Sequence, residues 1–174
     1  MALVKISKGA DIRHEYTDGV SRVPVLEGAY KDAAVERISL QPGAELSPAL
    51  YSKTEHNQVF LITAGKGYIA TPRRVFNITE VSVFVPDFDK EQFTFHCAAD
   101  AKECMEIVHF VTELNDYDKT CLKEAHLTLP RFRGVSQAWH YKEDFTGADI
   151  QQMMMIEHRN LGRLSMGANF GTGP

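Results

Sequence analysis

Short apolar runs separated by turn-forming residues dominate the chain between residues 34 and 111. The runs are rich in Val, Ile and Phe, and Gly, Pro, Asn or Asp stands between them. Closely spaced short strands of this kind favour an antiparallel sandwich or barrel. The predicted strands are residues 35–40, 59–63, 68–71, 81–85, 93–97 and 107–111, and the clearest predicted turns are Pro42-Gly43 and Gly65-Lys66-Gly67.

The run 81–85 shows the alternation of a strand most plainly. Val81, Val83 and Val85 alternate with Ser82 and Phe84. Side chains of a strand point to opposite faces in turn, so this strand is predicted to have one apolar face and one mixed face and to be a core strand.

Charge and hydropathy exclude several classes of function. The 174 residues suffice for one domain with or without an appendage, and the net charge of −4 comes without a basic block, so nucleic-acid binding has no support. No run approaches the roughly 20 apolar residues of a membrane span, and the N-terminus lacks the features of a signal peptide. The chain has three cysteines, Cys97, Cys104 and Cys121, and no CxxC pair. An odd number of cysteines favours free thiols in a reducing compartment over a disulfide framework. We therefore expect a cytoplasmic protein that binds neither nucleic acid nor membrane.

Two segments of the chain resemble each other in sequence, a similarity that we call the internal echo. Residues 36–48 align without gaps on residues 162–174, with identities at Arg37 and Arg163, Ser39 and Ser165, and Pro48 and Pro174. The offset of 126 residues is about one domain, so the chain is expected to begin a second copy of its β domain.

The echo predicts the domain organisation and a partner. Residues 1–33 form an N-terminal arm, 34–115 a β-barrel, 116–148 a linker with a short helix, and 149–174 the opening strands of a second barrel. Unpaired strand edges are a hazard that natural proteins cover or pair. We therefore expect either a second polypeptide that completes the second barrel or a homodimer formed by strand exchange.

Three segments resemble the two sequence motifs of the cupin superfamily, whose members are small antiparallel β-barrels. They are Gln41-Pro-Gly-Ala-Glu-Leu, the stretch from Asn57 to Gly67, and the stretch from Glu80 to Pro86. The resemblance implies an all-β, cupin-like jelly roll followed by a short helical linker and the first strands of a second barrel. Cupin enzymes hold a divalent metal through three His and one Glu inside the barrel.

The metal ligands of the cupin motifs are absent at the matching positions. Gln58 stands seven residues before Gly65, where the family has Glu, and residues 51–54, which include Tyr51 and Lys53, replace the His-x-His region. A neutral amide is a weak metal ligand, and an ammonium group opposes a dication. We expect no metal cofactor in this barrel.

Two kinds of site remain open inside the barrel. An irregular metal site would use His56, His96 and His109, although isolated strand histidines are more often hydrogen-bonded residues than ligands. Alternatively, a small polar ligand would bind in the barrel mouth and contact Tyr51, Gln58, Glu91 and His96. If no ligand binds there, these four are solvated surface residues. The sequence assigns no catalytic residue.

Two function classes follow from the resemblance. In the first, the chain is the N-terminal barrel of a two-barrel cupin (bicupin) enzyme that isomerises, hydrolyses or oxygenates a small polar metabolite. The divalent metal of such an enzyme (Mn, Fe or Zn) would lie in the second barrel, on another chain. In the second, the chain is a non-catalytic module that binds a small ligand or pairs as a homodimer. No hydrolase-elbow, P-loop, zincin or Rossmann motif is present.

Overall fold

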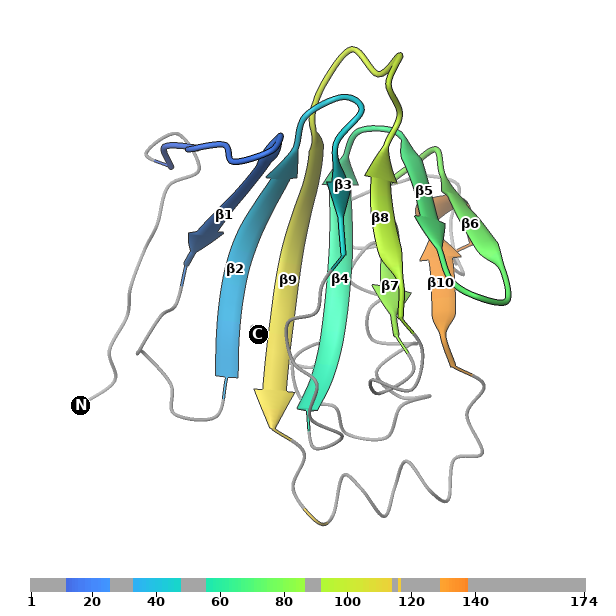
Figure 1. Cartoon of the computed structure of the whole chain (residues 1–174). Coiled ribbons are helices and arrows are strands. Elements are labelled where there is room, and N and C mark those ends of the chain that lie inside the picture. The colour runs from blue at the N-terminus through green and yellow to red at the C-terminus, as the bar shows by residue number, and fades with distance from the viewer. Residues whose placement is uncertain are drawn as a thin grey trace, which may run out of the picture.

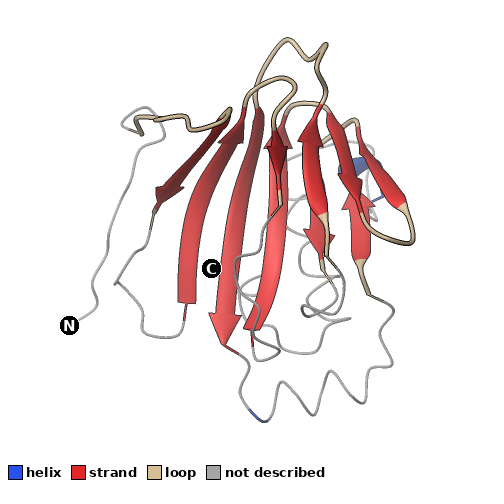
Figure 2. Cartoon of the chain, in the orientation of Figure 1, coloured by secondary structure: helices blue, strands red, loops and turns tan. Residues whose placement is uncertain are grey.

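Two antiparallel sheets face each other around one apolar core (Figures 1 and 2). The computed structural model describes residues 12–25, 33–47, 56–86, 92–113, 116 and 129–137. Sheet A has the order β1 (Val20–Pro24), β2 (Ala33–Leu40), β9 (Met105–Glu113), β4 (His56–Ala64), β7 (Ser82–Val85) and β10 (Arg131–Gly134). Sheet B has the order β3 (Glu45–Leu46), β8 (Thr94–Cys97), β5 (Gly67–Ala70) and β6 (Val75–Ile78). The predicted all-β antiparallel architecture is confirmed.

Each predicted strand lies within or overlaps a strand of the structure, and both predicted turns are present. Gly43 and Gly65 have φ angles of 84° and 89°, a region that suits glycine far better than other residues. Four strands were not predicted: β1, β3, β6 and β10. Two of them lie in segments that the sequence assigned elsewhere, because β1 falls in the arm 1–33 and β10 falls in the linker 116–148.

Strand β7 is a core strand, as predicted, and both of its faces are buried. Ser82, Val83, Phe84 and Val85 are each at most 2% exposed. Phe84, on its mixed face, belongs to the apolar core, and β4 and β10 pair with its two edges, so the strand lies inside sheet A. The hydroxyl of Ser82 is satisfied by donating to the carbonyl oxygen of Glu80, so the buried polar residue leaves no unpaired donor.

The carboxylate of Glu80, in the turn before β7, forms hydrogen bonds to the segment that follows β10. Glu80 accepts a hydrogen bond from the backbone N–H of Ser136 at 3.0 Å, and a second from the Ser136 hydroxyl. Residue 136 belongs to a short 3₁₀ helix, η2 (Val135–Gln137). A side chain at Gly134 would collide with the Glu80 carboxylate. Glycine at this position therefore lets the carboxylate reach the helix.

Several predictions fall on parts of the chain that the structure does not describe. They are the short helix of the linker, the second-barrel strands at 149–174, and Cys121. Within the described ranges, Cys97 and Cys104 are free thiols. No helix in those ranges has the length and apolar character needed to cross a membrane.

Candidate functional site

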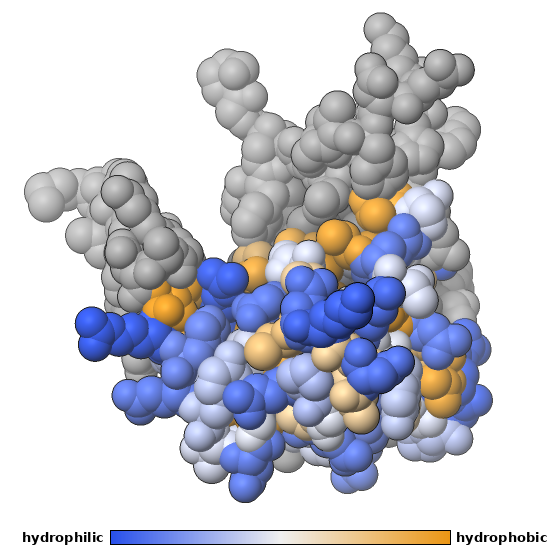
Figure 3. Space-filling model, turned by 90° about the horizontal axis from the view of Figure 1, so that it is seen from above, coloured by the Kyte–Doolittle hydropathy of each residue, from blue (hydrophilic) through white to orange (hydrophobic). Residues whose placement is uncertain are grey.

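The inner face of sheet A is apolar at one end of the barrel and polar toward the other. At the end that carries the loops 41–44 and 98–104, the inward side chains include Leu40, Ile62 and Met105, all fully buried. Figure 3 looks onto this end, where the surface is largely hydrophilic and apolar residues form small separate patches. Further along the same strands, away from these loops, the inward positions become polar.

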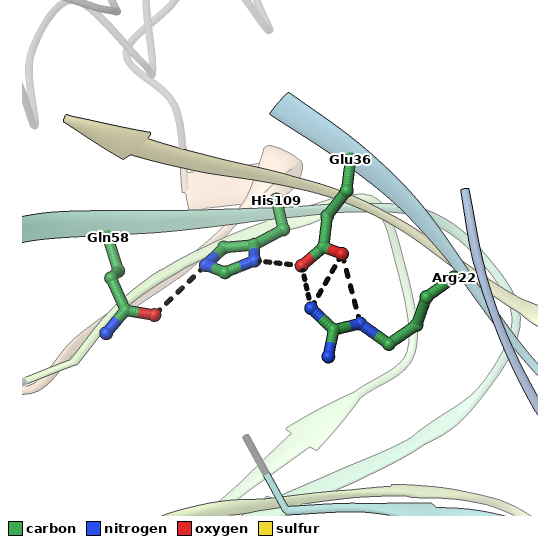
Figure 4. A network of polar contacts seen from close by, with 4 residues as sticks. All are labelled: Arg22, Glu36, Gln58 and His109. Atoms are coloured by element: carbon green, nitrogen blue, oxygen red, sulfur yellow. Dashed lines mark hydrogen bonds and ion pairs between the residues drawn. The ribbon is translucent and has the colours of Figure 1, made fainter. Parts of the chain in front are cut away.

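Four polar side chains cross this part of the inner face (Figure 4), and we call them the polar row: Arg22, Glu36, His109 and Gln58. The Arg22 guanidinium donates to both carboxylate oxygens of Glu36 at 2.7–3.0 Å. Nδ1 of His109 lies 2.6 Å from Oε1 of Glu36, and Nε2 lies 3.0 Å from Oε1 of Gln58. Each member contacts the next, so the row links β1, β2, β9 and β4.

Strand register places these four residues on one face. Glu36 and His109 lie directly opposite each other, while Arg22 pairs with Ile38 and Gln58 pairs with Val111. Residues two apart on a strand share a face, and diagonal neighbours on adjacent strands are within reach of long side chains. The row is therefore a diagonal of inward positions continuous with the apolar core.

The two residues of the row nearer the sheet edge are more exposed than the two farther in. The side chains of Arg22 and Glu36 are 32% and 13% exposed, whereas His109 is fully buried and Gln58 is 4% exposed. Removing charges from water is costly unless they are paired and hydrogen-bonded. The bidentate contact with Arg22 meets that requirement for Glu36. The Arg22 side chain itself stays partly exposed to solvent.

The surroundings move the pKa values of both titratable groups at the centre of the row. Burial alone would raise the pKa of Glu36, but the hydrogen bonds from His109 and Arg22 outweigh it and the pKa lies below its ordinary value. Burial lowers the pKa of His109, and the contact with Glu36 offsets only part of that effect. Glu36 is therefore a carboxylate at neutral pH, and His109 resists protonation more than an exposed histidine.

The His109 ring is also held by an aromatic neighbour. Phe60 lies directly opposite His109 in the strand pairing, and its ring stacks on the imidazole with a centroid distance of 4.1 Å and an interplanar angle of 5°. Phe60 itself packs against Phe84, Phe93 and Phe95. The plane of the imidazole is thus set by the core, and its two nitrogens point along the row.

His96, a predicted site residue, lies elsewhere. It sits on β8 between the core residues Phe95 and Cys97, so its side chain faces away from the core. There its ring stacks on Tyr68 at 4.3 Å, and its Nδ1 lies 3.2 Å from Oε1 of Glu45. The structure brings Gln58 and His109 together and does not bring His96 to them.

The remaining predicted site residues lie outside what the structure describes. Tyr51, Lys53 and Glu91 are in ranges without described placement, and for His56 the structure gives the backbone position at the start of β4 but not the side chain. Their proposed roles stay predictions.

Sequence reasoning missed half of the polar row, Arg22 and Glu36. A signal for Glu36 was present, because it shares the parity of Ile38 and Leu40 in a predicted strand and so had to face the core. Arg22 carried no such signal, since its strand was not recognised. The link from Glu36 to His109 spans 73 residues of sequence, so only the fold reveals it.

Acidification is expected to destabilise the barrel in two steps. The unfolded His109 titrates near 6.5 and the folded one lower, so between these values the unfolded chain binds more protons and the free energy of unfolding falls as pH falls. Glu36 adds a second loss below its unfolded value of 4.5. Urea unfolding followed by fluorescence at a series of pH values measures both steps.

Two histidine variants assign the first step. His109→Gln should remove it, whereas His96→Gln, which changes the outward imidazole, should leave it in place. A wild-type stability that is constant between about pH 7 and about pH 5 would contradict the assignment.

Solved structures with the same architecture share little sequence with this chain. KdgF from Halomonas sp. matches with a TM-score of 0.52 at 10% identity, over 66% of this chain and 97% of KdgF. A predicted oxalate decarboxylase from Thermotoga maritima gives a TM-score of 0.52 at 16% identity, over 63% of this chain and 100% of that one. Both are cupin structures. The chain has the cupin fold. No family model and no curated protein sequence matches it.

Cupins often carry a metal, but the described residues of this cupin barrel do not fit one. Both ring nitrogens of His109 already have hydrogen-bond partners, and Gln58 offers a neutral amide where the family motif has a carboxylate. His96 faces outward, so it cannot share an ion with His109. Within the described ranges no three His, Cys, Asp or Glu side chains converge as a ligand set. The site is better suited to hydrogen-bonding an organic molecule than to coordinating a cation.

Proposed function

We propose that this cupin barrel is a binding module that takes a small polar organic ligand beside His109 and Gln58. The observation that carries the proposal is the polar row itself, a line of hydrogen-bonded side chains on the inner face of an otherwise apolar barrel. Ligands commonly enter β-barrels at their mouths, and the row lies toward the end remote from the loops 41–44 and 98–104.

The energetics of the row support a role beyond stability. A buried ion pair is weak evidence for stabilisation, because well-packed apolar residues of similar volume often serve as well or better. The row instead combines an amide, a group type that both donates and accepts hydrogen bonds, with an imidazole next to it. Hydroxyl, carbonyl and carboxylate groups are the ligand atoms that such a pair recognises.

A ligand screen with matched variants tests this proposal. Saturation-transfer NMR on mixtures of sugars and hydroxy acids should find binders for the wild-type chain, and Gln58→Leu should weaken binding roughly tenfold or more. Asn77→Leu removes an amide from the exposed position on β6 and should bind like wild type. Equal binding by wild type and Gln58→Leu, or no binder among these compounds, would count against the proposal.

The purified barrel is expected to contain less than one transition metal ion per chain, because Gln58 and the hydrogen-bonded His109 offer no free ligand pair. Inductively coupled plasma mass spectrometry after growth in medium supplemented with Mn, Fe and Zn measures this. A stoichiometric metal that survives gel filtration would show that side chains which the structure does not describe, those of His56 and Tyr51 among them, complete a metal site.

A second candidate function is favoured by the echo between residues 36–48 and 162–174. In it, the chain supplies the N-terminal barrel of a bicupin enzyme, and another polypeptide completes a second barrel that holds the metal and the catalytic residues. The alternative partner is an identical chain that exchanges strands. Intact-mass spectrometry of native and denatured samples separates these cases. A single 19.5 kDa species after denaturation would reject the two-chain arrangement.

A further inference from the structure

The outer face of sheet A, opposite the polar row, carries a second set of apolar side chains. Strand alternation places them there, because Phe60 on β4 and Ile107 on β9 point into the core. Leu61 lies directly opposite Val83 on β7 and Val108 on β9, so the apolar residues are continuous across three strands. We call this set the outer patch: Val59, Leu61, Val83, Val85, Val108 and Phe110.

Half of the outer patch is fully removed from water, although it lies outside the core. Phe110, Val83 and Val85 are 3%, 2% and 1% exposed, and none of them belongs to the apolar cluster between the sheets. Within the described ranges, the strands of sheet A make their extensive contacts with the strands paired to them. The segment before β1 lies over another part of this face, where Tyr16 reaches Ser39 on β2. The structure contains a single chain, so the cover is part of this chain.

The borders and the partial exposure of the outer patch restrict what can cover it. Arg131 and Arg133 on β10 lie opposite Val85 and Val83, so the patch has a basic border at that edge, and both arginines interact with further groups. The other three residues of the patch keep an intermediate exposure. A cover that leaves them partly open is narrower than a second sheet. It should be apolar over the patch and acidic beside β10.

We propose that residues 150–156 of this chain cover the outer patch. This run consists of Ile150, two glutamines, three methionines and Ile156. Methionine side chains adapt to irregular apolar surfaces. Even as a helix the seven residues span roughly 10 Å, which equals the two strand spacings from β7 to β9.

The order of residues along the chain matches the order of groups across the sheet. The described chain ends at residue 137, directly after β10 at the edge of sheet A (Figure 1). Acidic residues come next, at Glu143, Asp144 and Asp149, and the apolar run follows them. The twelve residues 138–149 extend to roughly 40 Å at most, more than the roughly 14 Å from β10 to β9. The acidic residues would then lie beside the arginines of β10.

Two other segments fit the outer patch less well. Residues 114–128 contain no run of more than two apolar residues. The apolar residues 1–4 are followed by Lys5 and Lys8, and ammonium groups are repelled by the arginines that border the patch.

The inference goes beyond the proposed function, because the outer patch and the polar row lie on opposite faces of sheet A. A failed ligand screen leaves the cover intact, and an uncovered patch leaves ligand binding intact. Residues 150–156 that cover their own barrel are, however, unavailable to open a second barrel with another polypeptide.

Photo-crosslinking in the full chain tests the proposal. With Met154→p-benzoylphenylalanine, irradiation should join position 154 to peptides of β4, β7 or β9, and the product should keep the 19.5 kDa mass of one chain after denaturation. Leu122→p-benzoylphenylalanine is the matched control in residues 114–128 and should give no such product. The proposal is overturned if position 154 reacts only between chains, if it does not react with these strands, or if position 122 reacts with them in its place.

A pair of lysine variants gives a second readout. Met154→Lys should loosen the cover, and binding of the apolar dye ANS should rise at least about threefold while the far-ultraviolet circular dichroism is unchanged. Phe170→Lys introduces the same charge beyond the apolar run and should bind the dye like wild type. Equal dye binding by the two variants would contradict the proposal. If Met154→Lys does not fold, the crosslinks decide.

Discussion

Replacing Gly67 with Ala is expected to unfold the barrel or to lower its free energy of unfolding by at least about 3 kcal/mol. A Cβ at this position would fall on the backbone carbonyl oxygen of His96, which belongs to the neighbouring strand β8, and would also press on the Met105 side chain. Backbone atoms cannot move aside without breaking the pairing of β5 with β8. Chemical denaturation of the variant measures the loss.

Gly43→Ala is the matched control for this substitution. Gly43 has a φ of 84°, yet its Cβ would meet nothing closer than Ala99 at 3.9 Å. The expected cost is the conformational penalty alone, about 1–2 kcal/mol. If both variants lost the same stability, the clash with His96 would not be the cause of the Gly67 effect.

Replacing Glu36 with Ala is expected to cost about 3 kcal/mol of stability. Breaking a buried ion pair leaves an uncompensated polar group, which typically costs about 3–5 kcal/mol. The low end applies because Arg22 is 32% exposed and can turn toward water. His109, fully buried, would lose the acceptor for its Nδ1 hydrogen. Urea denaturation at neutral pH gives the value.

Glu45→Ala provides the comparison, since Glu45 also contacts the Nδ1 of a histidine. The Glu45 side chain is 66% exposed and lies 3.2 Å from His96, so the loss should stay within about 0.5 kcal/mol. A Glu36 variant as stable as the Glu45 variant would mean that the polar row contributes little to folding. The same two variants also show which carboxylate governs the acid-induced loss of stability.

The central strands were predicted from their apolar periodicity. Strands β1 and β10 were missed because they contain charged residues or proline. The runs at 35–40 and 107–111 were recognised because their inward residues are large and aliphatic. Strand β1 carries Arg22 and Pro24, and β10 alternates Arg131 and Arg133 with Phe132, so neither reads as an apolar run. Among the described residues both are edge strands, and charge and proline are common at such positions because one edge has no sheet partner there.

The candidate site was predictable only as separate residues. Gln58 and His109 were singled out, one from its place in a motif and the other as a histidine on a strand. Their contact, and the contribution of Glu36, depend on the pairing of β2, β9 and β4, which no local pattern specifies. His96 shows the converse, because a histidine on a predicted strand has two possible faces and the sequence alone did not decide between them.

The strand order of sheet A has a consequence for how the chain acquires its structure. Apart from β1 and β2, no neighbouring strands of this sheet are consecutive in sequence, and β9 stands between β2 and β4. During synthesis, β2 and β4 therefore leave the ribosome long before the strand that pairs with both. Such long-range pairing slows folding and leaves apolar strands open to other chains in the meantime. The β5–β6 hairpin of sheet B needs no such delay. Expression at low temperature, with slower synthesis and weaker aggregation, should raise the soluble yield of this chain.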